Sequence, residues 1–139
     1  MSDDKRPKDE LAMRVLTILK LDSSGLKDRL VNYFPEYVNI LTSKRTREHF
    51  KDLFRSKYET ITFEDLRRCS QEIILEVERF YARVLSMKWY LYHTEDMPNR
   101  IQDKIAYDLK DLERSYDMLA LYIDAELAAH KDDPRAESA

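Results

Sequence analysis

The residues best spaced to do chemistry are four cations in the basic middle of the chain. They are Lys44, Arg47, Lys51 and Arg55, separated by steps of three, four and four. On a helix, residues at such steps project from one face. A row of cations on one face is typical of a surface that meets phosphates or an acidic protein partner. The alternative is a solvated helix face whose charges are relieved by neighbouring acidic residues.

Metal-ligating and nucleophilic residues show no comparable order. Di-iron sites in helical bundles use Glu-x-x-His pairs at a spacing of three, whereas Glu126 and His130 are four residues apart. The three histidines lie far along the chain from the single cysteine, Cys69, so no pairing of a nucleophile with a base is predicted. We therefore expect a protein that is not an enzyme and that carries no metal or cofactor.

Composition narrows the fold class and the compartment. One glycine and four prolines in 139 residues are too few for a turn-rich β architecture, so an all-α single domain is predicted. The charged N-terminus contains no apolar run that fits a signal peptide or membrane span, and one cysteine forms no internal disulfide. We expect a cytoplasmic protein that contacts neither a membrane nor a small-molecule substrate.

The element around which the chain must be built is a long helix over 62–93. Its apolar positions recur at alternating steps of four and three, as in a helical seam: Leu66, Ser70, Ile73, Val77, Phe80, Val84, Met87 and Leu91. Further apolar residues widen this arc beyond what one partner helix can cover, so the helix is predicted at the centre of a bundle. Thr62 and Asp65, three residues apart, predict a capping box at its start.

A second long helix is predicted over 98–131, opened by Pro98. Its seam has the same steps: Ile105, Leu109, Leu112, Tyr116, Leu119 and Ile123. Matched seams predict that 62–93 and 98–131 form a long antiparallel hairpin. The alternative is one continuous helix bent at Pro98.

Shorter helices are predicted to cover the hairpin. The pattern indicates a helix over 8–21, a turn at 22–25, a helix from Leu26 that breaks or kinks at Pro35, and a helix over 44–58. The prediction is thus an all-α bundle of four to five helices, in one domain over 8–131, with disordered tails at 1–7 and 132–139.

Two apolar surfaces on the long helices are candidates for binding a partner. The first is a strip that faces away from the main seam of 98–131, formed by Met118, Leu121, Tyr122 and Ala125. The second is the pair Trp89 and Tyr90. Either surface can instead be covered by the N-terminal helices or a neighbouring loop.

These surfaces favour a non-enzymatic module for protein interaction, regulation or assembly, with a protein partner or a second copy of the chain. The alternative is a nucleic-acid-binding helical protein that uses the basic row.

Overall fold

The computed structural model describes residues 9–44, 47–48, 50–93 and 98–131, and the predicted tails lie outside them. Every regular element in this part of the chain is helical. The elements are α1 (Asp9–Lys44), α2 (Phe50–Leu53), the 3-10 helix η2 (Tyr58–Thr60), α3 (Phe63–Leu66), α4 (Gln71–His93) and α5 (Pro98–Lys131).

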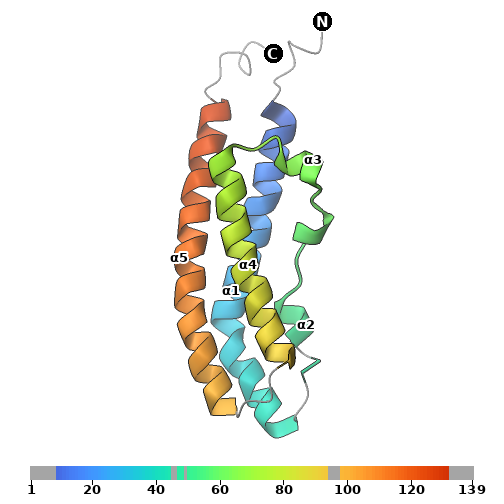
Figure 1. The fold of residues 1–139 in the computed structure, drawn as a ribbon, viewed down its shortest axis with the longest axis vertical. Coiled ribbons are helices and arrows are strands. Elements are labelled where there is room, and N and C mark those ends of the chain that lie inside the picture. The colour runs from blue at the N-terminus through green and yellow to red at the C-terminus, as the bar shows by residue number, and fades with distance from the viewer. Residues whose placement is uncertain (1–8, 45–46, 49, 94–97, 132–139) are drawn as a thin grey trace, which may run out of the picture.

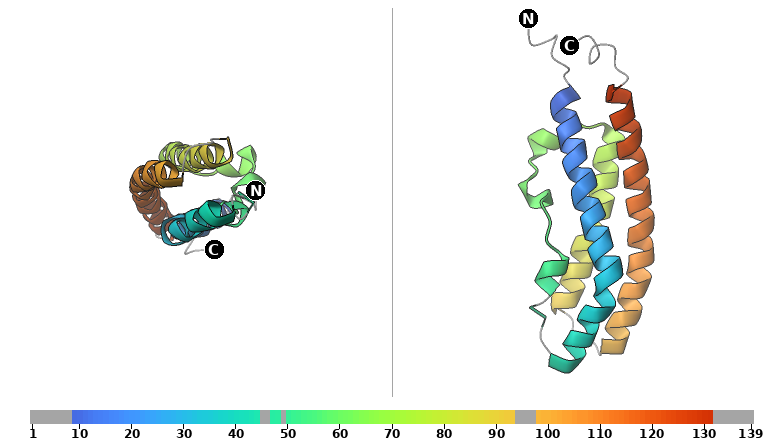
Figure 2. Two further views of the ribbon diagram at one scale, coloured as in Figure 1. Left: turned by 90° about the horizontal axis from the view of Figure 1, so that it is seen from below. Right: turned by 180° about the vertical axis from the view of Figure 1, so that it is seen from behind.

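The three long helices form a bundle whose fourth side is irregular. Helices α1 and α4 run in the same direction, and α5 runs opposite to both and packs against both (Figure 1). The segment from α2 through η2 to α3 returns along the remaining side and packs against α1. Seen from the end, the three long helices and this segment surround a common interior (Figure 2). The predicted all-α bundle on an antiparallel hairpin is confirmed, and the single helix bent at Pro98 is wrong.

The core is built from the seams that the sequence predicts. On α4 the buried members are Ile73, Val77, Phe80, Val84, Met87 and Leu91. On α5 they are Ile105, Leu112, Leu119 and Ile123, with Leu109 and Tyr116 half-buried against them. Removing these side chains from water is the main stabilising contribution to the hairpin.

The central helix starts later than predicted. The capping box of Thr62 and Asp65 exists, with both hydrogen bonds at 3.1 Å, but it caps the four-residue α3. The long helix α4 begins at Gln71 after a turn. Its cap is Ser70, whose hydroxyl accepts a hydrogen bond from the Ile73 N–H at 3.3 Å. The Ser70 N–H donates to the Glu126 carboxylate on α5, which fixes where α4 starts.

The N-terminal region is one 36-residue helix, so the predicted turn at 22–25 is wrong. The polar residues of that stretch are satisfied without a turn. Ser23 is buried and its hydroxyl donates to the Lys20 carbonyl one turn back, as serines inside helices do. Asp22 accepts hydrogen bonds from distant parts of the chain. Pro35 also lies inside α1, so the chain does not break there.

The predicted helix over 44–58 is reduced to α2 and η2. Its apolar residues Phe50, Leu53 and Phe54 are nevertheless buried, as the pattern predicts. The backbone that follows them is held by side chains of α1. The Arg29 guanidinium donates to the carbonyls of Leu53 and Arg55, which replaces helical hydrogen bonds at that point.

Candidate functional site

The structure disperses the basic row. Lys44 is the last residue of α1, Arg47 lies outside any helix, Lys51 is in α2 and Arg55 follows α2. The four residues therefore do not share a helix face. Lys51 and Arg55 are exposed and line a cavity instead.

This cavity, which we call the basic cavity, has a volume of about 740 Å³ and lies between α1, the segment after α2, and α4. Its apolar wall contains Ile18, Leu21 and Phe54. Its charged lining is mostly cationic and comprises Arg29, Lys51, Arg55, Lys57 and Lys88, against Asp22 and Glu59. Five cations and two carboxylates give a formal charge of +3.

The Asp22 carboxylate connects the segments of the chain that form the wall of the cavity. It accepts hydrogen bonds from the Ser56 hydroxyl at 2.6 Å, the Lys57 N–H at 2.7 Å and the Tyr81 hydroxyl at 2.6 Å. Burial, and then the bond to Asp22, raises the pKa of Tyr81. The ring of Tyr58 stacks on that of Tyr81, with centroids 3.8 Å apart. These contacts join α1, α4 and the segment after α2 into one wall.

The cations of the basic cavity have no carboxylate partner among the described residues. None of the five takes part in an ion pair there, although at least eight other lysines and arginines do. Two N–H groups of the Arg29 guanidinium donate hydrogen bonds to backbone carbonyls, which carry no net charge. The sequence gives no signal for Arg29 and Lys88 as lining residues, because each comes from a different long helix.

The predicted apolar strip on α5 is uncovered. Helix α1 packs on another side of α5, where Lys20 pairs with Asp124 at 2.6 Å. Met118 and Leu121 are 43% and 62% exposed, and Ala125 is exposed as well. The N-terminal helices therefore do not cover these three residues. Tyr122 differs, because it is half-buried against the core.

The row that contains this strip continues toward the start of α5 through two charged residues. Tyr107, which is 69% exposed, precedes Met118 by eleven residues, which are steps of four, three and four in a heptad pattern. We call the whole row on α5 the outer seam. Its members are Tyr107, Asp111, Arg114, Met118, Leu121 and Ala125, at steps of four, three, four, three and four.

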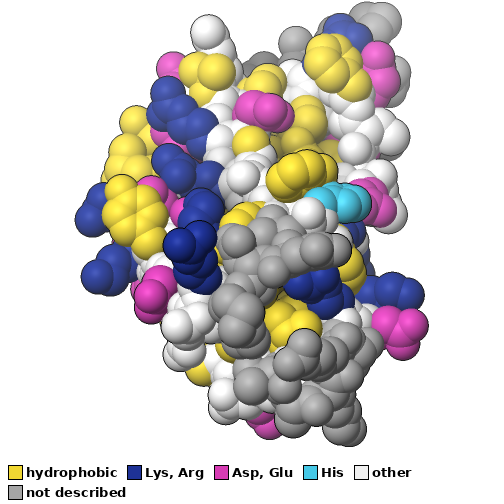
Figure 3. Space-filling model, turned by 60° about the horizontal axis from the view of Figure 1, so that its bottom comes forward, with side chains coloured by type: hydrophobic (Ala, Val, Ile, Leu, Met, Phe, Trp, Pro, Cys, Tyr) yellow, Lys and Arg dark blue, Asp and Glu magenta, His cyan; other side chains and the backbone are white. Residues whose placement is uncertain are grey.

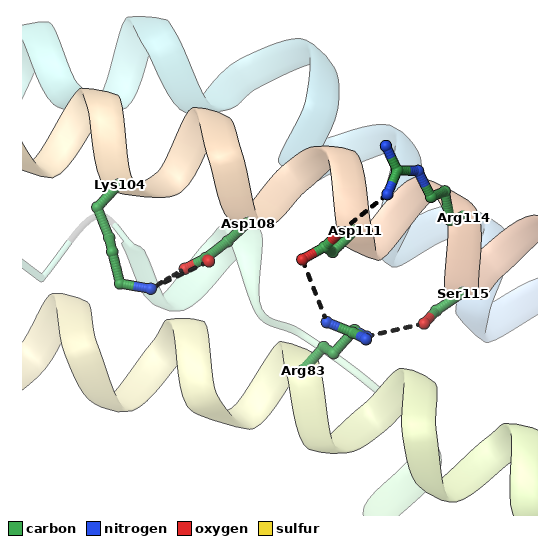
Figure 4. Close-up of polar contacts among 6 residues, drawn as sticks. All are labelled: Arg83, Lys104, Asp108, Asp111, Arg114 and Ser115. Atoms are coloured by element: carbon green, nitrogen blue, oxygen red, sulfur yellow. Dashed lines mark hydrogen bonds and ion pairs between the residues drawn. The ribbon is translucent and has the colours of Figure 1, made fainter.

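Polar contacts hold α4 beside the outer seam and set the register of the hairpin (Figure 4). Arg83 of α4 donates to the Ser115 hydroxyl at 2.9 Å and lies 3.6 Å from the Asp111 carboxylate. Arg114 pairs with the same carboxylate at 3.4 Å. Together with the bond between Ser70 and Glu126, this register puts the exposed Leu75 of α4 level with Leu121.

The predicted pair Trp89 and Tyr90 does not belong to this surface as a unit. Tyr90 is half-buried beneath Lys104, whose ammonium lies 5.6 Å from the ring centroid. Trp89 is 64% exposed and lies against His93. The hairpin register places Trp89 at the level of Tyr107, at the other end of the outer seam from Leu121.

Other kinds of site find little support in the described ranges. No three His, Cys, Asp or Glu side chains gather there closely enough to hold a metal ion. Burial raises the pKa of the Cys69 thiol to about 11, so it is protonated at neutral pH. Among the described helices, none has the length and apolar character needed to cross a membrane.

Comparisons with family models, curated proteins and solved structures find no match to this chain.

Proposed function

We propose that the protein is a non-enzymatic interaction module that binds an amphipathic helix of a protein partner along the outer seam. One observation supports this proposal above others: α5 carries a second row at heptad spacing whose apolar members do not pack into the bundle, while its Asp111 pairs with Arg83 of α4. The inner row is buried or half-buried, whereas Tyr107 and Leu121 of the outer row are 69% and 62% exposed.

The spacing of the outer seam favours a helix as the partner's binding element. Alternating steps of four and three form the seam along which two helices interlock side chains. From Tyr107 to Ala125 the seam is about 27 Å long at 1.5 Å per residue, enough for five turns of a partner helix. Leu75 of α4, which is 49% exposed, lies at the level of Leu121 along the bundle. Ala125 lets a partner helix approach closely there.

The charge around the Tyr107 end of the seam is mixed, because four cations and four carboxylates lie within seven residues of Tyr107. Arg100 and Lys110 lie near Tyr107 in sequence, are exposed, and form no ion pair with a described residue. At the left in Figure 3, Lys and Arg side chains lie among hydrophobic and acidic side chains. Complementary charge would orient the partner and speed its encounter, while apolar burial would supply affinity.

The nucleic-acid alternative stays a prediction, and the four residues of the basic row do not lie on one helix face. We do not propose it as the function. A titration with a single-stranded oligonucleotide at low salt tests it directly, since phosphate-dominated binding weakens steeply as salt increases.

The proposed function is tested by placing a charge in the outer seam. Leu121→Asp should weaken association with the partner, or self-association, by about 2 kcal/mol, or roughly 30-fold, because a carboxylate would be buried against apolar side chains. The measurements are sedimentation of the pure protein and quantitative co-purification from its native cells. The variant should keep its stability within about 0.5 kcal/mol, since Leu121 is exposed.

Leu85→Asp is the matched control. Leu85 is 57% exposed on α4 and lies outside the outer seam, so this variant should associate like the wild type. Equal association of all three proteins would contradict the proposal. Unfolding of Leu121→Asp would assign that residue to the core and would contradict it as well.

A further inference from the structure

We infer that the basic cavity binds an amphipathic organic phosphate, with the phosphate among its lysines and arginines and the apolar part against α1. This inference is independent of the proposed function, because the cavity and the outer seam are built from different residues.

The first argument is charge. Five cations converge on the basic cavity from α1, α2, the segment after α2, and α4. Of its two carboxylates, Asp22 already accepts three hydrogen bonds from other groups. Cations held close together repel one another, and no carboxylate in the described part of the chain pairs with them. A bound anion would relieve that repulsion.

The second argument is preorganisation. The Arg29 guanidinium and the Asp22 carboxylate hold the backbone of residues 53–57 against α1. The stacked rings of Tyr58 and Tyr81 connect the same segment to α4. The backbone that carries Arg55 and Lys57 is therefore fixed before a ligand arrives, so less ordering is needed on binding.

The third argument is the apolar wall, which a bare ion would not use. Leu21 is 70% exposed and Ile18 is 43% exposed at the wall that α1 contributes. A volume of about 740 Å³ lies within the range of pockets that take organic ligands. The combination favours a ligand with an anionic head and an apolar body.

A phosphate monoester fits the head position better than a monocarboxylate. At neutral pH it carries nearly two negative charges and offers three acceptor oxygens. Those oxygens can meet cations that come from several directions, as they do here.

The test is calorimetric titration of the full chain with octyl phosphate, with inorganic phosphate and octanol as separate probes. We expect saturable binding of one octyl phosphate per chain, much weaker binding of inorganic phosphate, and none of octanol. The double variant Lys57→Ala with Lys88→Ala should weaken octyl phosphate binding at least about tenfold, because two charge-assisted contacts are lost. Its helical circular dichroism should match that of the wild type.

The matched control is Arg100→Ala with Lys110→Ala, which removes the same charge from the exposed face of α5. It should bind octyl phosphate within about twofold of the wild type if contacts inside the cavity, and not net charge, determine affinity. Vesicles that contain phosphatidic acid then distinguish two sources of the phosphate. If the wild type binds the vesicles and the Lys57→Ala, Lys88→Ala variant does not, the ligand is a lipid headgroup. If the wild type does not bind them, the ligand is an organic phosphate free in solution. The inference is overturned if octyl phosphate does not saturate, if inorganic phosphate binds equally well, or if both double variants bind alike.

Discussion

A single carboxylate, that of Asp22, joins α1 to two other parts of the chain. The Tyr81 hydroxyl brings α4 to it, and Ser56 and Lys57 bring the segment after α2. The sequence predicts a turn at Asp22, because Asp, Ser and Gly in succession are typical of turns. The residues that satisfy it lie 34 to 59 positions away, which no local pattern can indicate.

At this scale, Tyr81→Phe should destabilise the protein by about 1 to 2 kcal/mol, because the half-buried Asp22 carboxylate loses one of its three donors. The control is Tyr92→Phe on the same helix. The Tyr92 hydroxyl is buried and has no hydrogen-bond partner among the described residues, so its removal should cost little or should stabilise the fold. Urea denaturation of the two variants measures the difference. Equal losses would show that the bond to Asp22 contributes nothing specific.

At the scale of elements, prediction succeeded where local signals were enough. Helix α5 has the predicted bounds, because Pro98 opens it and an uninterrupted seam follows. Helix α4 starts at Gln71 and not at 62, because its cap, Ser70, is selected by Glu126 on another helix. The predicted capping box is real but belongs to α3. The basic cavity could not be predicted for the same reason. Its cations lie far apart in the sequence and come together only in the folded chain.

The cap of α4 can be tested by Ser70→Ala, which should destabilise the protein by about 1 kcal/mol through loss of the acceptor for the Ile73 N–H. The same substitution at the exposed Ser86, inside α4, should be neutral or slightly stabilising, because alanine is the better helix former. Thermal unfolding of both variants separates the effect of the cap from that of helix propensity. A smaller loss for Ser70→Ala than for Ser86→Ala would contradict the assignment.

At the scale of the whole molecule, the two faces of α5 differ in what they contact. The inner face packs against α1 and α4, and the apolar members of the outer seam are left to solvent. The irregular segment on the fourth side holds the basic cavity against α1 and α4. The molecule therefore offers an apolar helical face and a cationic cavity built from different residues.

The most direct measurement of the central claim is photo-crosslinking in the native cell, with benzoylphenylalanine replacing one residue at a time. At Leu121 and at Met118, both in the outer seam, we predict a single covalent adduct of the same mass, either with a partner protein or with a second copy of the chain. Leu85, which is equally open to solvent, should give no such adduct. Adducts that are identical at Leu85 and Leu121, or no adduct at Leu121, would contradict the account.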